Sequence, residues 1–143
     1  MPVRPTPEPI RLAILGVGNC ASSLVQGLTH YADRNDASGR MHQSIGGYTA
    51  RDIKVVAAWD VDERKVGCDV AEAVFAPPNC TKRFCPDLPM TGVTVAMGAV
   101  LDGISDHMAD MPAERTFLPA DHPQPNRAEV VRQLRQARAD VLI

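Results

Sequence analysis

A short glycine-rich segment near the N-terminus has the clearest capacity for chemistry in this chain. It fits the pattern GxGxxG/A and consists of Gly16, Val17, Gly18, Asn19, Cys20 and Ala21. The first glycine of this pattern permits a tight turn, the second lets a phosphate approach the backbone, and the small last residue lets a helix pack closely on a strand. Free amides at the N-terminus of that helix favour an anion. The segment therefore predicts a binding site for the diphosphate of a dinucleotide, and an ordinary structural turn is the alternative.

Asp60 is the second residue that such a site needs. It follows the apolar run Ile53–Trp59, where a carboxylate could accept hydrogen bonds from the hydroxyls of the adenosine ribose. Its negative charge would also disfavour the additional phosphate of NADP. Asp60 lies about twice as far from the glycine segment as the usual separation of roughly 20 residues, because a polar insertion runs from His30 to Asp52. The neighbouring basic residues Arg64 and Lys65 keep NADP open as an alternative.

The other reactive side chains form no comparable pattern. Cys20 could act as a nucleophile, since a helix N-terminus can activate a thiol, but its place in the glycine segment favours a packing role. The cysteines lack a paired CxxC and are expected to be reduced thiols, and a metal site on Cys80 and Cys85 is the less favoured alternative. The histidines form no spaced pair and are expected on the surface. No residue is assigned a catalytic role and no metal is expected. The cysteines are Cys20, Cys68, Cys80 and Cys85, and the histidines are His30, His42, His107 and His122.

The hydrophobic pattern places these residues on alternating strands and helices. Ile10 to Leu15 is a short apolar run typical of a buried strand, and the apolar spacing after Asn19 indicates a helix. A second strand is predicted over Ile53–Trp59. A helix from Glu63 to about Phe75 follows, capped by Asp62 and ended by two prolines, and a third strand covers Val93–Ala96. The polar insertion between the first helix and the second strand is expected to be irregular.

The second half of the chain gives a weaker pattern until its last helix. Leu101–Met111 is read as a short helix before a loop rich in proline. Asn126 and Glu129 stand in the relation of a capping box, which predicts a helix to about Ala139 with Arg132, Arg135 and Arg138 on its wet face. A fourth strand begins at Asp140. This alternation predicts an α/β fold with a Rossmann-like parallel sheet and flanking helices, cut at about its fourth strand. Residues 1–9 are expected to be a disordered proline-rich tail, and residues 10–143 a partial NAD-binding domain.

Composition argues against several other classes of protein. Of the 143 residues, 45% are hydrophobic and 22% are charged, as in ordinary globular domains. The formal net charge of −2 and the lack of a basic cluster make nucleic acid an unexpected partner. No apolar run approaches the roughly 20 residues that span a bilayer, and no export signal is visible, so a cytoplasmic protein without membrane contact is expected.

Three strings in the sequence resemble a known family. They are IRLAILGVGNCASSLVQG, GGYTARDIKVVAAWDVDERKVGCDVAEAVFAPPN and GVTVAMGAVLDGI. They resemble the N-terminal region of the actinobacterial myo-inositol-1-phosphate synthases (inositol-3-phosphate synthases), over Ile10–Gly103 and more thinly to Ile143. The resemblance implies an isomerase of inositol and phospholipid biosynthesis that converts glucose 6-phosphate into inositol phosphate with tightly held NAD. It also implies that hydride leaves the sugar, an enol forms, an aldol reaction closes the ring, and hydride returns.

The resemblance also implies roles for individual residues. By position, the glycine segment together with Ser22 would hold the diphosphate, Asp60 the ribose, and Asp102 and Gly103 would lie near the cofactor. The family usually reads RGPT where this chain has residues 97–100, and its catalytic and tetramer-forming regions lie beyond Ile143. We therefore expect an NAD-binding part that is inactive alone and that meets glucose 6-phosphate only when the missing region is supplied. Association with a complementary chain or a second copy is expected at the cut sheet. The alternatives are a non-catalytic nucleotide-binding or partner-binding module and half of an ordinary dehydrogenase.

Overall fold

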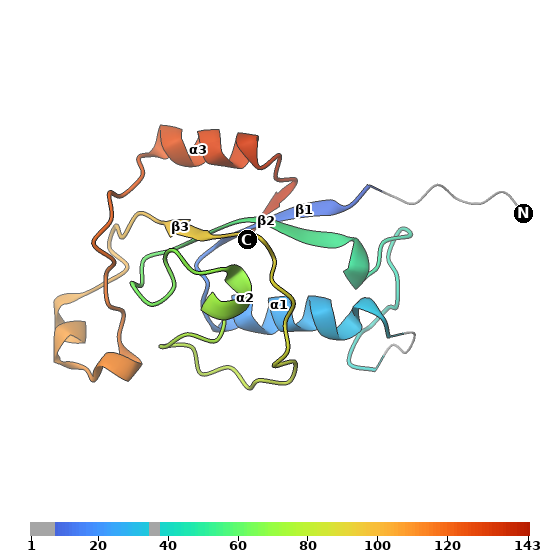
Figure 1. Ribbon diagram of the computed structural model, residues 1–143, viewed down its shortest axis with the longest axis horizontal. Coiled ribbons are helices and arrows are strands. Elements are labelled where there is room, and N and C mark those ends of the chain that lie inside the picture. The colour runs from blue at the N-terminus through green and yellow to red at the C-terminus, as the bar shows by residue number, and fades with distance from the viewer. Residues whose placement is uncertain (1–7, 35–37) are drawn as a thin grey trace, which may run out of the picture.

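Four parallel strands form the centre of the protein. The computed structural model describes residues 8–34 and 38–143, and its strands are β1 (Ile10–Leu15), β2 (Ile53–Asp60), β3 (Val95–Met97) and β4 (Val141–Leu142). Their order across the sheet is β3-β2-β1-β4 (Figure 1). This is the strand order of the first half of a Rossmann sheet, in which the direction of progression reverses between β1 and β4. The predicted α/β fold with a Rossmann-like parallel sheet is confirmed.

The register of β1 and β2 brings their carboxyl ends together. Ile10 lies opposite Ile53 and Leu15 lies opposite Trp59, with one irregularity after Leu12. In such sheets ligands bind outside the carboxyl ends of the strands, near the point where the order reverses. The glycine segment after β1 and Asp60 at the end of β2 therefore lie at the edge of the sheet where a nucleotide would be expected.

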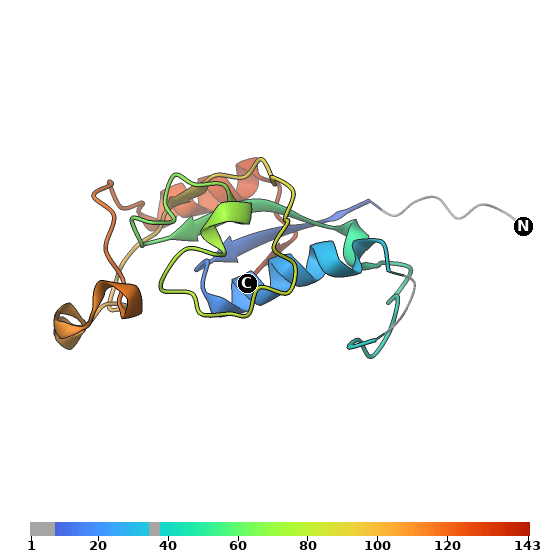
Figure 2. The ribbon, with the colours of Figure 1, turned by 60° about the horizontal axis from the view of Figure 1, so that its bottom comes forward.

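Helices cover both faces of this sheet. Helices α1 (Asn19–Ala32) and α2 (Val70–Ala73) lie on one face, and α3 (Arg127–Gln136) lies on the other (Figures 1 and 2). The core lies on the α1 side, because apolar residues of β1, β2 and β3 pack there against α1 and α2. Its buried members are Leu12, Ile14, Val17, Ala21, Val25, Ala58, Val70, Ala73, Val74 and Val95. The apolar spacing that predicted α1 is thus explained by one buried stripe.

Helix α3 is attached more loosely than α1. None of its residues is buried, and its fixed polar contact with the sheet is a hydrogen bond of 2.7 Å from Trp59 Nε1 to Gln133 Oε1. The predicted capping box of Asn126 and Glu129 is confirmed, because each residue's side chain accepts a hydrogen bond from the other's backbone N–H. Of the three arginines expected on its wet face, Arg132 and Arg135 are exposed on α3, whereas Arg138 is exposed beyond the end of the helix, with φ +52°.

Strand β4 is held to β1 by one ion pair and the parallel pairing. Asp140 accepts hydrogen bonds from Arg11 N, Nε and Nη2 at 2.9, 2.9 and 2.7 Å, and its own N–H donates to Arg11 O. The predicted fourth strand is confirmed at Val141–Leu142. It lies at the edge of the described sheet, and Val141, Leu142 and Ile143 are 43%, 47% and 52% exposed.

The helix predicted from Glu63 to Phe75 is wrong over its first half. Residues 63–68 form turns, and α2 is only Val70–Ala73, with the Asp69 side chain accepting from Ala71 N. Gly67 has φ +88°, a conformation outside the helix that separates the two halves. The Asp62 carboxylate accepts from Arg64 N at 2.9 Å, as a capping residue would, but the residues that follow form turns and not a helix. The same carboxylate also binds the Arg64 side chain and the Leu118 N–H.

Two other expectations need adjustment. Leu101–Met111 is not one α-helix but a turn followed by a 3₁₀ helix at Asp106–Asp110, and this part of the chain projects beyond the sheet in Figure 1. Helix α1 runs to Ala32, past His30 where the insertion was expected to begin, and a 3₁₀ turn at Ala50–Asp52 ends that insertion. The tail expected over residues 1–9 lies outside the described residues except for Glu8 and Pro9, which are exposed. No helix within residues 8–34 and 38–143 is long and apolar enough to cross a bilayer.

Candidate functional site

The loop between β1 and α1 divides into a held part and a free part. Gly16 has φ +99°, which confirms the tight turn, and its N–H donates to Trp59 O at 2.8 Å. The Val17 N–H donates to Asp60 Oδ2 at 2.7 Å. The next four N–H groups, those of Gly18, Asn19, Cys20 and Ala21, have no acceptor among the described residues, and helical bonding begins with Ser22 N to Gly18 O at 2.9 Å. Four consecutive donors at the positive end of α1 are therefore open to an anion.

Neither the backbone conformation nor the packing around Gly18 requires a glycine at this position. Its φ of −91° and ψ of −160° are extended backbone that any residue adopts. A Cβ built on it would meet no atom within 4 Å. The space beside Gly18 is therefore open, and in this motif a glycine at that position lets a pyrophosphate approach the backbone. The glycine thus fits the cradle expected for a diphosphate.

Asp60 holds the glycine loop as well as ending β2. The carboxylate is 7% exposed and accepts three backbone hydrogen bonds: from Val17 N through Oδ2, and from Val61 N and Asp62 N through Oδ1 at 2.8 and 2.9 Å. A carboxylate oxygen has two lone pairs, so Oδ2 retains one for a further donor such as a ribose hydroxyl. The ribose role stays a prediction, and the role of Asp60 in the loop was not foreseen.

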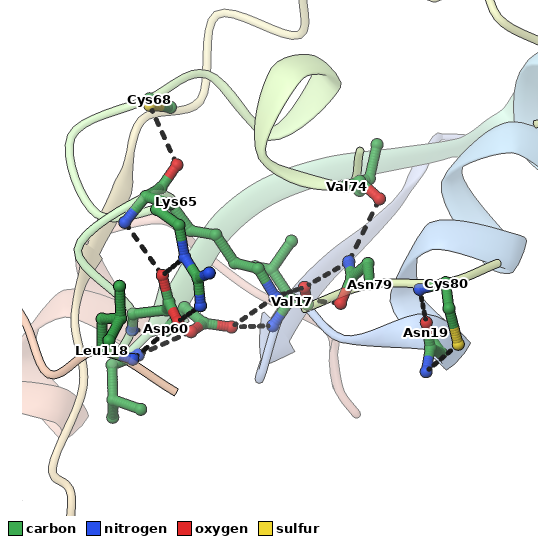
Figure 3. Close-up of polar contacts among 12 residues, drawn as sticks. Val17, Asn19, Asp60, Lys65, Cys68, Val74, Asn79, Cys80 and Leu118 are labelled. Carbon is green, nitrogen blue, oxygen red and sulfur yellow. Dashed lines mark hydrogen bonds and ion pairs between the residues drawn. The ribbon is translucent and has the colours of Figure 1, made fainter. Parts of the chain in front are cut away.

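A buried lysine and asparagine complete this network (Figure 3). Lys65 is fully buried, and its Nζ donates to Val17 O at 2.8 Å and to Asn79 Oδ1 at 3.0 Å. Asn79 Nδ2 also donates to Val17 O, at 3.0 Å. Lys65 Nζ lies 3.9 Å from Asp60 Oδ2. Burial lowers the pKa of Lys65, although the nearby carboxylates of Asp60 and Asp62 oppose that shift.

Arg64 and Lys65, the two basic residues that left NADP as an alternative ligand, both bind other groups of this chain. Arg64 binds Asp62 through Nε and Nη2 at 2.7 and 2.6 Å, and it donates to the carbonyls of Ala113 and Thr116. Burial alone would raise the pKa of Asp62, but hydrogen bonds from the Arg64 side chain and from the Leu118 N–H keep it lowered. Lys65 is engaged as well, so both side chains have hydrogen-bond partners within the described chain.

Residues 79–85 are pinned to α1 beside the free N–H groups. Asn19 Oδ1 accepts from Cys80 N at 2.8 Å and from Thr81 Oγ1 at 3.1 Å. Gln26, which is fully buried, accepts from Phe84 N and Cys85 N and donates to Lys82 O. The sequence gives no local signal for these contacts, because the paired residues lie about sixty positions apart and residues 79–85 belong to no recognised motif.

The remaining predicted site residues are placed less directly. Ser22 is buried, its N–H is used by Gly18 O and its Oγ accepts from Gln26, and both polar backbone groups of Val17 are also used. Asp102 and Gly103 lie in an exposed turn after β3, and no hydrogen bond joins them to Gly16–Ser22 within the described chain. Ala21 packs in the core as expected. Cys20 is exposed, so the expected packing role is wrong.

The described residues do not contain a cluster of side chains suited to bind a metal ion. The four cysteines are free thiols, and no group of three or more histidine, cysteine or acidic side chains among residues 8–34 and 38–143 could hold an ion. A groove of about 590 Å³ lies between α1 and residues 40–50. It reaches Ile10 and Ile53, at the amino ends of β1 and β2, so it is separate from the glycine loop.

Comparison with known proteins gives close relatives. No family model matches the chain. The inositol-3-phosphate synthases of Corynebacterium glutamicum and Mycobacterium tuberculosis are each 44% identical over 94% and 97% of the chain, and that of Mycolicibacterium smegmatis is 47% identical over 94%. The chain spans 35–37% of the length of these relatives.

Solved structures agree with these relatives. The crystal structure of Ari2 matches 94% of the chain at 32% identity and a TM-score of 0.67, and the chain covers 37% of it. A myo-inositol-1-phosphate synthase-related protein from Thermotoga maritima matches 94% of the chain with a TM-score of 0.57; its 20% identity supports the fold alone, and the chain covers 33% of it. Over nearly all of its own length, therefore, this chain is a homologue of the inositol-3-phosphate synthases and corresponds to about a third of such a protein.

Proposed function

We propose that this chain is the NAD-binding part of an inositol-3-phosphate synthase. The observation that carries the proposal is Gly18, whose missing side chain serves neither the backbone nor the packing but leaves four free N–H groups accessible. The 44–47% identity to the synthases over 94% of the chain supports NAD as the ligand. The occupied Arg64 and Lys65 favour NAD over NADP, because no cation of this pair is left for the additional phosphate.

In the complete enzyme the reaction would be isomerisation of D-glucose 6-phosphate to 1D-myo-inositol 3-phosphate. Bound NAD supplies a hydride acceptor that is regenerated in the same cycle. The residues of this chain would hold the diphosphate on the amides of Gly18–Ala21 and orient the adenosine ribose at Asp60. We assign no catalytic residue here. Since the relatives are about three times as long, we propose that the chain alone binds NAD and does not isomerise glucose 6-phosphate.

Gly18 offers a direct test. Gly18→Val suits the extended backbone, and its Cβ would meet no atom within 4 Å, so we expect the free energy of unfolding to change by less than about 1 kcal/mol. Its side chain would fill the diphosphate space, so NAD binding measured by calorimetry should fall by more than about tenfold. Gly27→Ala is the matched control, because a Cβ there also meets no atom and lies within α1, away from the loop. Equal NAD affinity in Gly18→Val and the parent would refute the proposal. Equal affinity of the parent for NAD and NADP would refute the proposed preference for NAD.

The exposed edge of β4 favours a second candidate function, the recruitment of another chain. Val141, Leu142 and Leu15 are apolar and 43%, 47% and 55% exposed beside an open edge strand. Such an edge pairs readily with a further strand. Sedimentation over a range of concentrations tests this: Val141→Lys should shift the chain toward monomer, and an unchanged distribution would exclude this edge as the contact.

A further inference from the structure

Lys65 is a buried lysine whose side chain contacts the glycine loop in the network of Figure 3. The other two lysines, Lys54 and Lys82, are exposed, whereas Lys65 has no exposed surface. Burying an ammonium group is unfavourable unless it finds several acceptors. Lys65 Nζ contacts Val17 O at 2.8 Å, Asn79 Oδ1 at 3.0 Å and Asp60 Oδ2 at 3.9 Å. Its closest partner is thus the backbone of the glycine loop.

The contact falls on the peptide where the loop changes direction. The N–H groups of Gly16 and Val17 point inward and are bound, and those from Gly18 onward are free. In a trans peptide the C=O and the following N–H point in opposite directions. Holding the Val17 carbonyl inward therefore turns the Gly18 N–H outward. Lys65 and Asn79 both donate to that carbonyl, so two side chains fix the orientation of a single peptide.

We propose that Lys65 is a positioning residue for dinucleotide binding, which holds the Val17–Gly18 peptide so that the Gly18 N–H faces the diphosphate. This inference rests on the proposed function for the identity of the ligand. The orientation of the loop itself can be measured without any ligand. Lys65 acts through the backbone and does not contact the cofactor.

A simple ion pair with Asp60 is the competing explanation, and the distances argue against it. Asp60 already accepts three backbone N–H groups, and its oxygen is 3.9 Å from Lys65 Nζ, against 2.8 Å for the Val17 carbonyl. If the ion pair were the whole role, removing Lys65 would change stability without turning the Gly18 amide. The two explanations therefore differ in a signal that belongs to one residue.

The experiment uses the full chain with Lys65→Met, Asn79→Ala and the exposed control Lys54→Met. Each variant is measured without urea, after its own unfolding curve has shown that more than about 99% of the molecules are folded. Two quantities are measured: the ¹H–¹⁵N position and hydrogen exchange of the Gly18 amide, and NAD affinity by calorimetry. We expect the Gly18 signal to move in Lys65→Met and Asn79→Ala, and NAD to bind about ten- to a hundredfold more weakly in Lys65→Met. Lys54→Met should match the parent in both.

The outcomes separate this inference from the proposed function. An unmoved Gly18 signal in Lys65→Met overturns the inference whether or not NAD binds. A moved signal with unchanged NAD affinity also overturns it, because the orientation would then not matter to the ligand. A parent chain that shows no NAD binding refutes the proposed function, and the Gly18 signal still decides what Lys65 does to the loop. If Lys65→Met does not fold, Asn79→Ala decides, since it removes the second donor to the same carbonyl.

Discussion

Removal of the Asp60 carboxylate should destabilise the fold before any effect on a cofactor is considered. Asp60→Ala leaves three backbone donors without their acceptor, two of them in buried hydrogen bonds, those of Val17 and Asp62. An unsatisfied buried donor costs about 1–3 kcal/mol, so the two together cost about 2–6 kcal/mol. The Val61 donor, which is partly buried, adds less. A domain of this size is typically stable by only about 5–15 kcal/mol, so we expect a large fraction of the stability to be lost.

Urea unfolding followed by far-ultraviolet circular dichroism measures this loss. Asp60→Asn is the informative partner variant, because its remaining carbonyl can still accept from Val61 and Asp62 while its NH₂ faces the Val17 N–H. It should lose about 1–3 kcal/mol, less than Asp60→Ala. Asp87→Ala is the control, since Asp87 is exposed and makes no hydrogen bond with the described residues. A loss below about 1 kcal/mol in Asp60→Ala would show that the three hydrogen bonds do not hold the loop. Weak NAD binding by Asp60 variants is consequently no proof of a ribose contact.

Three further results are expected. Burial lowers the pKa of Lys65, so between that lowered pKa and the usual 10.5 the unfolded chain binds one more proton than the folded chain. The free energy of unfolding should therefore rise with pH in this window in the parent and not in Lys65→Met. Urea unfolding at a series of alkaline pH values measures this difference. The Arg11 side chain lowers the pKa of Asp140 from 3.8 to about 2, so its contribution is present above pH 3.8 and is lost as the pH falls toward 2; hydrogen exchange at Ile143 should accelerate in that range, and an unchanged rate would contradict the role of this pair. Gln26→Ala should cost about 2–4 kcal/mol in urea unfolding, because it strands the N–H groups of Phe84 and Cys85 and leaves a cavity, whereas a cost near zero would mean that residues 82–85 are held by other contacts.

The sequence predicts the parts of this fold that depend on local signals. A glycine that needs positive φ, an apolar strand before it and a helical stripe after it all lie within twenty residues, and each was identified correctly. The capping box of Asn126 and Glu129 is equally local. The error at α2 has a local cause as well, since Asp62 and Asp69 are both suitable caps and only the backbone of Gly67 decides between them.

The parts that were missed depend on contacts between distant segments. Lys65 was considered only as a cation that kept NADP open, because nothing in the neighbouring sequence reveals that its Nζ binds the Val17 carbonyl and Asn79. Gln26 was not singled out, although its side chain binds the backbone nearly sixty positions later. The position of Asp60 at the end of the second strand was predicted, but its hydrogen bond to the loop could not be inferred from spacing. Burial of polar side chains against remote backbone leaves no periodic trace in a sequence.

The lack of buried residues in α3 affects which part of the protein unfolds first. A helix without buried residues contributes little to the energy that resists local unfolding, and β4 follows it directly in the chain. Residues 127–143 should therefore detach at a free energy below that of global unfolding. Their departure would leave β1 as the outermost strand on that side and the indole of Trp59 in water. Nucleotide affinity and self-association would then both respond to mild conditions that spare the tightly packed opposite face.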